Sequence, residues 1–126
     1  MSPRLARLSF GVLALAIPVW WVAMGRDVAF RALFVPSTEW ATMRSFLVPD
    51  LALAVLAAAV AMMPTRGRTR GLLAAAATGG WGYATIWTCS AWVVGTVTAA
   101  SAVSMLIGAG IVIIASYALV SSSVDC

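Results

Sequence analysis

The stretch GLLAAAATGGWGYATIWTCSAWVVGTVTAASAVSMLIGAGIVIIASYALVS, residues 71–121, decides the fold, because it contains no charged side chain and no histidine. A single helix over these residues would be about 76 Å long, whereas the hydrocarbon core of a bilayer is about 30 Å thick. The stretch therefore predicts two membrane-spanning helices, near residues 71–94 and 98–120. The segment GTVTAAS, residues 95–101, predicts a short turn that makes them antiparallel neighbours.

The composition of the whole chain also predicts a membrane protein. The 126 residues are 63% hydrophobic and 10% charged, whereas soluble domains carry about 25% charged residues. A soluble fold of this size cannot hide so much apolar surface, because most of the shell of a small domain stays exposed. We therefore expect the lipid bilayer to surround the chain.

Two further spans are predicted near residues 8–24 and 46–63. The first ends in Trp20 and Trp21, which is typical of the membrane interface. A basic start and an apolar stretch also fit a signal peptide, but no clean small-residue cleavage site follows. We therefore interpret the first stretch as a retained span. The second helix begins near Thr38, and Pro49 within it predicts a bend.

The segment between these two spans is expected to lie at the membrane surface. Residues 27–35 predict a short interfacial helix, in which Asp27 and Arg31 are four residues apart. Ser37 is a candidate N-cap, and Glu39 then falls in the first turn of the next helix. The predicted fold is an all-α integral membrane protein. It is a single four-transmembrane-helix bundle over residues 1–126 with a short interfacial segment between helices 1 and 2.

The distribution of arginines predicts the orientation. The N-terminal tail and the loop PTRGRTRG, residues 64–71, together hold five arginines, whereas the first connection holds three and the last none. The positive-inside rule then places both termini in the cytoplasm. The lysine-free, alanine-rich composition suggests a bacterial cytoplasmic (inner) membrane protein. The net charge of +4 does not indicate nucleic-acid binding, because the arginines lie beside apolar runs.

The sequence contains no residue pattern that indicates a metal or cofactor site. The absence of histidine excludes a His-based triad and a His-ligated haem. The two cysteines, Cys89 and Cys126, form no C-x-x-C pair, and Cys89 is expected to be a small buried hydrophobe. We therefore predict no metal site and no cofactor.

Glu39 and Asp50 are the candidate catalytic residues, because an ionisable side chain at membrane depth is a functional candidate by default. In a continuous helix they lie on one face, about 16 Å apart along the axis. The alternative is that both only cap helices, with Arg44 as a possible ion-pair partner.

The third predicted span carries an unusual number of aromatic and hydroxyl side chains. Trp81, Thr85, Thr88 and Trp92 share one helical face, and Tyr83, Trp87 and Ser90 form a second stripe. These side chains either pack against other helices or line a pocket for a hydrophobic molecule. The predicted ligand-binding residues are Trp40, Trp81, Tyr83, Trp87, Thr88 and Trp92.

The fourth predicted span carries small residues at a spacing of four. Ala100, Ser104 and Gly108 form this small-xxx-small stripe, with Gly110 beside it. Such stripes allow close approach of another helix, so these three are the predicted helix-packing residues. The partner helix belongs either to this chain or to another subunit.

Three classes of function follow from these features. The preferred one is an accessory or packing subunit, or a binder of a lipophilic small molecule, in contact with other membrane subunits or a second copy of itself. The first alternative is an acid–base isomerase or cyclase of isoprenoids, sterols or other lipids. There Asp50 or Glu39 would donate a proton, and tryptophan faces would stabilise a cation. The second alternative is a small oligomeric transporter. The depth and contacts of Asp50 discriminate among them.

Overall fold

A computed structural model describes residues 1–63 and 68–124, and within these ranges the chain contains helices and no strand. The elements, in chain order, are α1 (Pro3–Arg26), α2 (Val28–Ala32), η1 (Ser37–Glu39, a 3₁₀ turn), α3 (Trp40–Arg44), α4 (Leu47–Met62), α5 (Arg68–Val93) and α6 (Ala99–Val124). The all-helical class predicted from the sequence is therefore confirmed.

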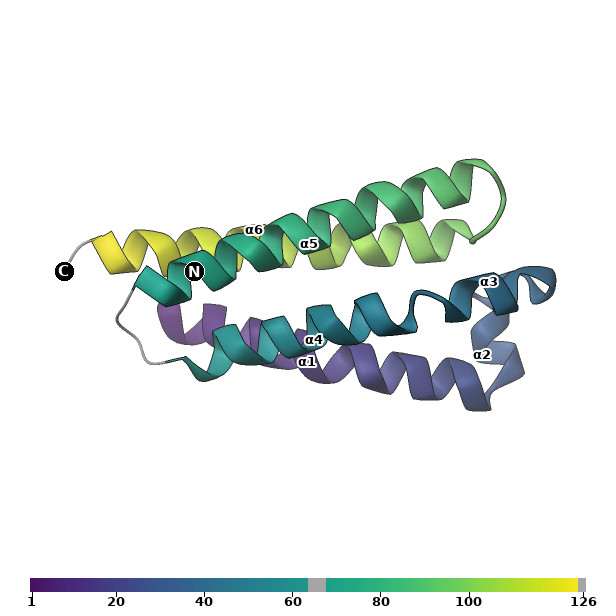
Figure 1. The fold of residues 1–126 in the computed structure, drawn as a ribbon, viewed down its shortest axis with the longest axis horizontal. Coiled ribbons are helices and arrows are strands. Elements are labelled where there is room, and N and C mark those ends of the chain that lie inside the picture. Colours follow the sequence, from purple (N-terminus) through teal and green to yellow (C-terminus); the bar gives the residue numbers. More distant parts are fainter. Residues whose placement is uncertain (64–67, 125–126) are drawn as a thin grey trace.

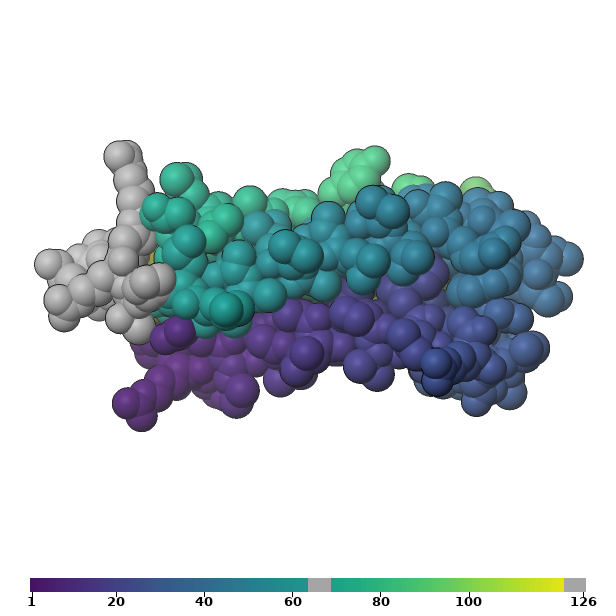
Figure 2. Space-filling model, turned by 60° about the horizontal axis from the view of Figure 1, so that its bottom comes forward, coloured from purple at the N-terminus to yellow at the C-terminus, as the bar shows by residue number. Residues whose placement is uncertain are grey.

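The four long helices run side by side along one axis (Figure 1). Helix α1 packs against α4 and α6, and α5 packs against α6 and α4. The start of α1 and the end of α6 lie at the end of the bundle where α4 ends and α5 begins, whereas α2, α3 and the α5–α6 turn lie at the opposite end (Figure 1). Figure 2 shows α1 and α4 in contact along one face, with residues 27–46 at one end of it.

Two of these helices are long and apolar enough to cross a membrane, namely α1 and α6. A third candidate arises if Ser37–Arg44 and Leu47–Met62 count as one span, bent by 57°. Helix α5 is 26 residues long, but its glycine, threonine, tyrosine and tryptophan residues make it less apolar. The structure thus supports membrane association, and the complete four-span bundle stays a prediction.

The bend before α4 lies earlier than the sequence predicted. The expected helix from Thr38 through Pro49 does not form, because α3 ends at Arg44 and α4 begins at Leu47. In a continuous helix the Pro49 ring would clash with the carbonyl of Ser45, four residues earlier. With the break at that carbonyl, Pro49 falls in the first turn of α4, where its missing N–H is not needed.

The interfacial segment forms a helix, Asp27 and Arg31 contact other groups, and the N-cap predicted at Ser37 for the next helix is wrong. Asp27 caps α2, because its side chain accepts a hydrogen bond from the Phe30 amide at 3.1 Å. Arg31 instead lies over the ring of Trp40, 4.6 Å from the centroid. Pro36, rather than Ser37, occupies the N-cap position of η1, and no side chain caps that turn.

The predicted turn between the last two helices is present and is built on Gly95. This residue has a φ of +83°, a conformation that favours glycine. The Thr96 amide donates to the Ala91 carbonyl at 2.8 Å, and the Gly95 amide donates to the Trp92 carbonyl at 3.0 Å. These two bonds form a Schellman motif, which satisfies the carbonyls at the end of α5.

Candidate functional site

The Asp50 carboxylate contacts a tryptophan of a neighbouring helix. Asp50 lies in the first turn of α4 and is half-buried. Its Oδ2 accepts a hydrogen bond from the indole Nε1 of buried Trp21 on α1 at 2.9 Å. The contact joins two helices, and the position of Asp50 also places a negative charge at the positive end of the α4 dipole.

Aromatic side chains fill the space around this contact. A buried cluster contains Trp21, Met24, Val35 and Met43, and the rings packed against it belong to Trp20, Phe30, Phe34, Trp40, Phe46 and Trp87. The rings of Phe46 and Trp87 are the closest pair, with centroids 3.6 Å apart. We call the end of the bundle formed by these residues the aromatic end. Its rings pack on one another beside the Trp21–Asp50 contact.

Hydroxyl groups of the α5–α6 turn close the aromatic end. Thr98 donates through its Oγ1 to the carbonyl of Leu33 at 2.6 Å, and through its amide to the carbonyl of Phe34 at 3.0 Å. Ser101 also donates to the Phe34 carbonyl, at 2.8 Å. These bonds satisfy the carbonyls that follow α2 and tie the interfacial segment to α6.

Glu39 does not join Asp50 in a shared site. It ends the 3₁₀ turn before the 57° bend, so the continuous helix that would align the two carboxylates is absent. Within the described residues, the Glu39 side chain makes no hydrogen bond or ion pair. The catalytic roles predicted for Asp50 and Glu39 stay predictions.

The predicted ligand-binding residues point in different directions. Trp81 is 3% exposed, and Thr88 is also buried, inside the bundle. Trp40 and Trp87 are half-buried in the aromatic end. The side chains of Tyr83 and Trp92 are 75% and 49% exposed. These six residues therefore differ in exposure, and their role in ligand binding stays a prediction.

Three hydroxyl contacts between α5 and α6 explain part of the polar character of α5. Thr78 donates to the Ser116 hydroxyl at 2.9 Å, and Ser116 donates to the Ala74 carbonyl at 3.3 Å. Thr85 donates to the Met105 carbonyl at 3.4 Å, in addition to its bond to the Trp81 carbonyl within α5. Such bonds join helices in a membrane. Thr78 and Ser116 were missed in the sequence because single hydroxyls do not mark a face.

The predicted small-residue stripe of α6 divides between two faces. Gly108 is buried, and a Cβ at its position would lie 3.0 Å from the indole nitrogen of Trp81. Ala100 and Ser104 are exposed, while Ser101 and Ala115 are buried. A spacing of four rotates by about 40° per step on an α-helix, so the stripe leaves the packed face. Whether Ala100 and Ser104 contact another subunit stays a prediction.

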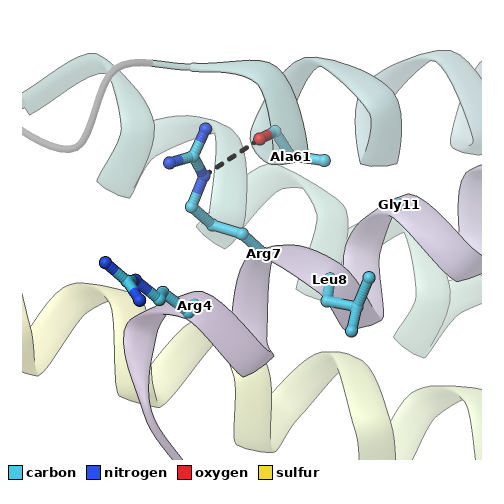
Figure 3. A pocket seen from close by; sticks show the side chains of 5 residues that line it. All are labelled: Arg4, Arg7, Leu8, Gly11 and Ala61. Atoms are coloured by element: carbon cyan, nitrogen blue, oxygen red, sulfur yellow. Dashed lines mark hydrogen bonds between the residues drawn. The ribbon is translucent and has the colours of Figure 1, made fainter.

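Arginines gather at the other end of the bundle. Arg7 donates from its Nε to the Ala61 carbonyl in the last turn of α4 at 3.0 Å, and Figure 3 shows the Arg4 and Arg7 side chains extending to the same side of α1. Arg70 at the start of α5 is buried. We call Arg4, Arg7 and Arg70 the arginine end. The sequence analysis used Arg70 only to predict orientation and missed its burial. Ala74, Ala77 and Trp81 follow it at intervals of four, three and four residues, which places all four on one helical face.

The described residues offer no group of three or more potential metal ligands of the Asp, Glu, Cys and His types. The two best-defined pockets in these ranges are open grooves beside the N-terminal half of α1, away from Asp50. Cys89 is a free, half-buried thiol.

Comparisons with family models, curated proteins and solved structures found no match. The function is therefore argued from the chemistry of the chain itself.

Proposed function

We propose that this protein is a four-span protein of a bacterial inner membrane, with both termini cytoplasmic, and that it is an accessory subunit that packs against another membrane protein. The start of α1, the end of α4, the start of α5 and the end of α6 lie at one end of the bundle (Figure 1), which supports an even number of crossings. The arginines at that end support its cytoplasmic location.

The outward face of α5 is the observation that carries the subunit role. Tyr83 lies near the middle of this helix with its side chain exposed. Gly79, one turn earlier, is also exposed, and a Cβ there would meet no atom within 4 Å. A tyrosine hydroxyl in hydrocarbon lacks a hydrogen-bond partner, and an exposed glycine is typical of a surface for helix packing. Both features favour a protein partner over lipid.

The outward face of α6 provides the contrast. Its exposed side chains include Val103, Leu106, Ile107, Ile113 and Ile114, which are suited to lipid tails. Its exposed tyrosine, Tyr117, lies toward the C-terminal end of the helix and not near its middle. The difference between the two helices also matches their hydropathy, because α6 is apolar enough to span alone and α5 is not. We therefore place the partner on α5 and lipid on this face of α6.

The contacts of Asp50 give less support to the enzyme and transporter alternatives. A general acid needs a substrate within hydrogen-bond reach, and a coupling carboxylate needs a water-filled path. Asp50 instead accepts the Trp21 indole N–H. Neither of the two grooves beside α1 includes it.

Photo-crosslinking in cells that produce the protein tests the subunit role. Benzoylphenylalanine replaces Tyr83 on α5 in one variant and Ile113 on α6 in the control, since both positions are exposed. We expect a protein adduct of discrete mass from position 83 and lipid adducts from position 113. An adduct of twice the chain mass would identify a second copy as the partner. Lipid adducts alone from both positions would contradict the proposal.

A substitution separates loss of the partner from loss of the fold. Tyr83→Leu should leave the thermal stability of the isolated chain nearly unchanged, because Tyr83 is 75% exposed and leucine keeps an apolar side chain there. It should weaken association with the partner in native mass spectrometry. Unchanged association would place the partner elsewhere.

A further inference from the structure

Arg70 is the most anomalous polar side chain in the described part of the chain. Its residue is 5% exposed, and its Nε and Nη2 are buried without any hydrogen-bond partner. The charged group that acts on it is Arg7, which is also positive. Burying an unpaired guanidinium is costly unless an anion compensates it. The geometry therefore calls for a negative group at this place.

The described acidic residues cannot supply that group. Asp27 precedes α2, Glu39 ends η1, and Asp50 lies in the first turn of α4. All three belong to the half of the bundle opposite the arginine end (Figure 1). The described residues contain no ion pair for Arg70. An anion from outside the described chain is needed.

Two neighbouring grooves on α1 suit a phospholipid. The first has a volume of about 360 Å³ and is lined by Arg4, Arg7, Leu8, Gly11 and Ala61 (Figure 3). The second has a volume of about 220 Å³, and its lining includes Leu5, Leu8, Val12 and Ile111. Leu8 belongs to both, so a basic groove adjoins an apolar one. A phosphate joined to an acyl chain has the same arrangement of charge and hydrocarbon.

We propose that the arginine end binds the phosphate of an anionic phospholipid, held by Arg4 and Arg7 in their groove, with one acyl chain in the groove beside Leu8. The phosphate charge then also compensates Arg70, which lies close enough for the charge of Arg7 to act on it. Guanidinium groups bind phosphate through paired, charge-assisted hydrogen bonds. Basic pockets at the cytoplasmic ends of membrane helices are suited to anionic headgroups. A lipid with a net negative charge is favoured over a zwitterionic one, because a quaternary ammonium group would be repelled by these arginines. The proposal rests on the membrane location of the chain and not on its partner.

Thermal unfolding in detergent, with titrated lipid, tests this site. The proteins are the native chain, Arg70→Met, Arg7→Met, and the control Arg44→Met, which removes an exposed arginine near the aromatic end. Phosphatidylglycerol should raise the unfolding midpoint of the native chain and of Arg44→Met. The apparent affinity for this lipid should fall about tenfold or more in Arg7→Met, as expected for a lost hydrogen bond to a charged group. It should fall by a smaller factor in Arg70→Met, which removes a nearby positive charge. Without lipid, Arg70→Met should be as stable as the native chain or more stable, because it removes an unpaired buried charge.

Three further additions distinguish other sources of the anion. Phosphatidylcholine and inorganic phosphate should each leave the midpoint nearly unchanged. An equal shift with inorganic phosphate would indicate a free-phosphate site and overturn the lipid proposal. An equal phosphatidylglycerol shift in Arg7→Met and the native chain would also overturn it. Asp125 lies outside the described residues, and Asp125→Asn should keep the lipid shift. A lipid-free Asp125→Asn protein that is strongly destabilised would instead identify this carboxylate as the partner of Arg70.

Discussion

The substitution Trp21→Phe removes the indole N–H and so tests whether the hydrogen bond to Asp50 stabilises the fold. Trp21→Phe keeps a ring in the aromatic end, where the Trp21 ring lies 5.5 Å from that of Trp20 and 6.1 Å from that of Trp40. It deletes the donor that lies 2.9 Å from the Asp50 carboxylate. Asp50 then has no partner among the described side chains. We therefore expect the variant to fold but to be less stable.

The size of the effect follows from the burial and charge of the pair. A hydrogen bond to a charged group contributes about 1.5–3 kcal/mol. Asp50 is half-buried, so headgroups and water recover part of the loss, and we expect about 2 kcal/mol. For a chain of this length that corresponds to a fall in Tm of about 6–10 °C. Asp50→Asn should cost less than about 1 kcal/mol, because the amide oxygen still accepts from the indole.

A double-mutant cycle separates this bond from ring packing. The cycle combines Trp21→Phe with Asp50→Ala and measures unfolding free energies in detergent, and the coupling energy should be about 1.5–2 kcal/mol. Additive effects, with coupling below about 0.5 kcal/mol, would refute the reasoning. Asp50→Asn also tests the alternatives. If it folds normally but abolishes an activity of the native protein, Asp50 is more than a structural group.

Three further predictions concern packing and topology. Gly108→Leu should lower stability by about 1–3 kcal/mol, because the new side chain would meet buried Trp81, whereas Gly71→Leu should cost less since a Cβ there meets nothing within 4 Å. Equal melting of the two variants would contradict the packing argument. Reporter fusions after residues 68 and 123 should both report the cytoplasm, and an external signal from either would overturn the orientation. Ser101→Ala should cost only about 0.5–1 kcal/mol, because the Phe34 carbonyl still accepts from a backbone amide; a larger fall in Tm would mean that the hydroxyl has another role.

Several features of this chain could be predicted because they depend on local sequence. The turn at Gly95 was placed from the small residues around it, and the structure gives that glycine a positive φ. The helix of the interfacial segment was also expected. The bend near Pro49 was predicted, but its position was wrong, because the ring acts on the carbonyl four residues earlier. Local rules therefore predict that a helix breaks near a proline, but they do not determine the residue at which it breaks.

The candidate site needed the tertiary structure. Trp21 and Asp50 are 29 residues apart in sequence, and no local pattern pairs an interfacial tryptophan with that carboxylate. Arg70 was interpreted only as an orientation signal, although its spacing from Trp81 placed it on the same helical face. Its burial depends on the helices that surround the first turn of α5, and a periodic pattern does not identify those neighbours.

The sequence by itself determined that this chain is helical and associates with a membrane, because hydropathy and backbone hydrogen bonding are properties of each segment alone. Only the tertiary structure decided which face of each helix is buried. Trp81 and Thr88 point inward and Tyr83 outward, although all three are on one helix. The apolar surroundings of a bilayer weaken the contrast between inside and outside that reveals the core of a soluble protein. Side-chain direction is therefore set by close packing and by the few polar partners that the other helices offer.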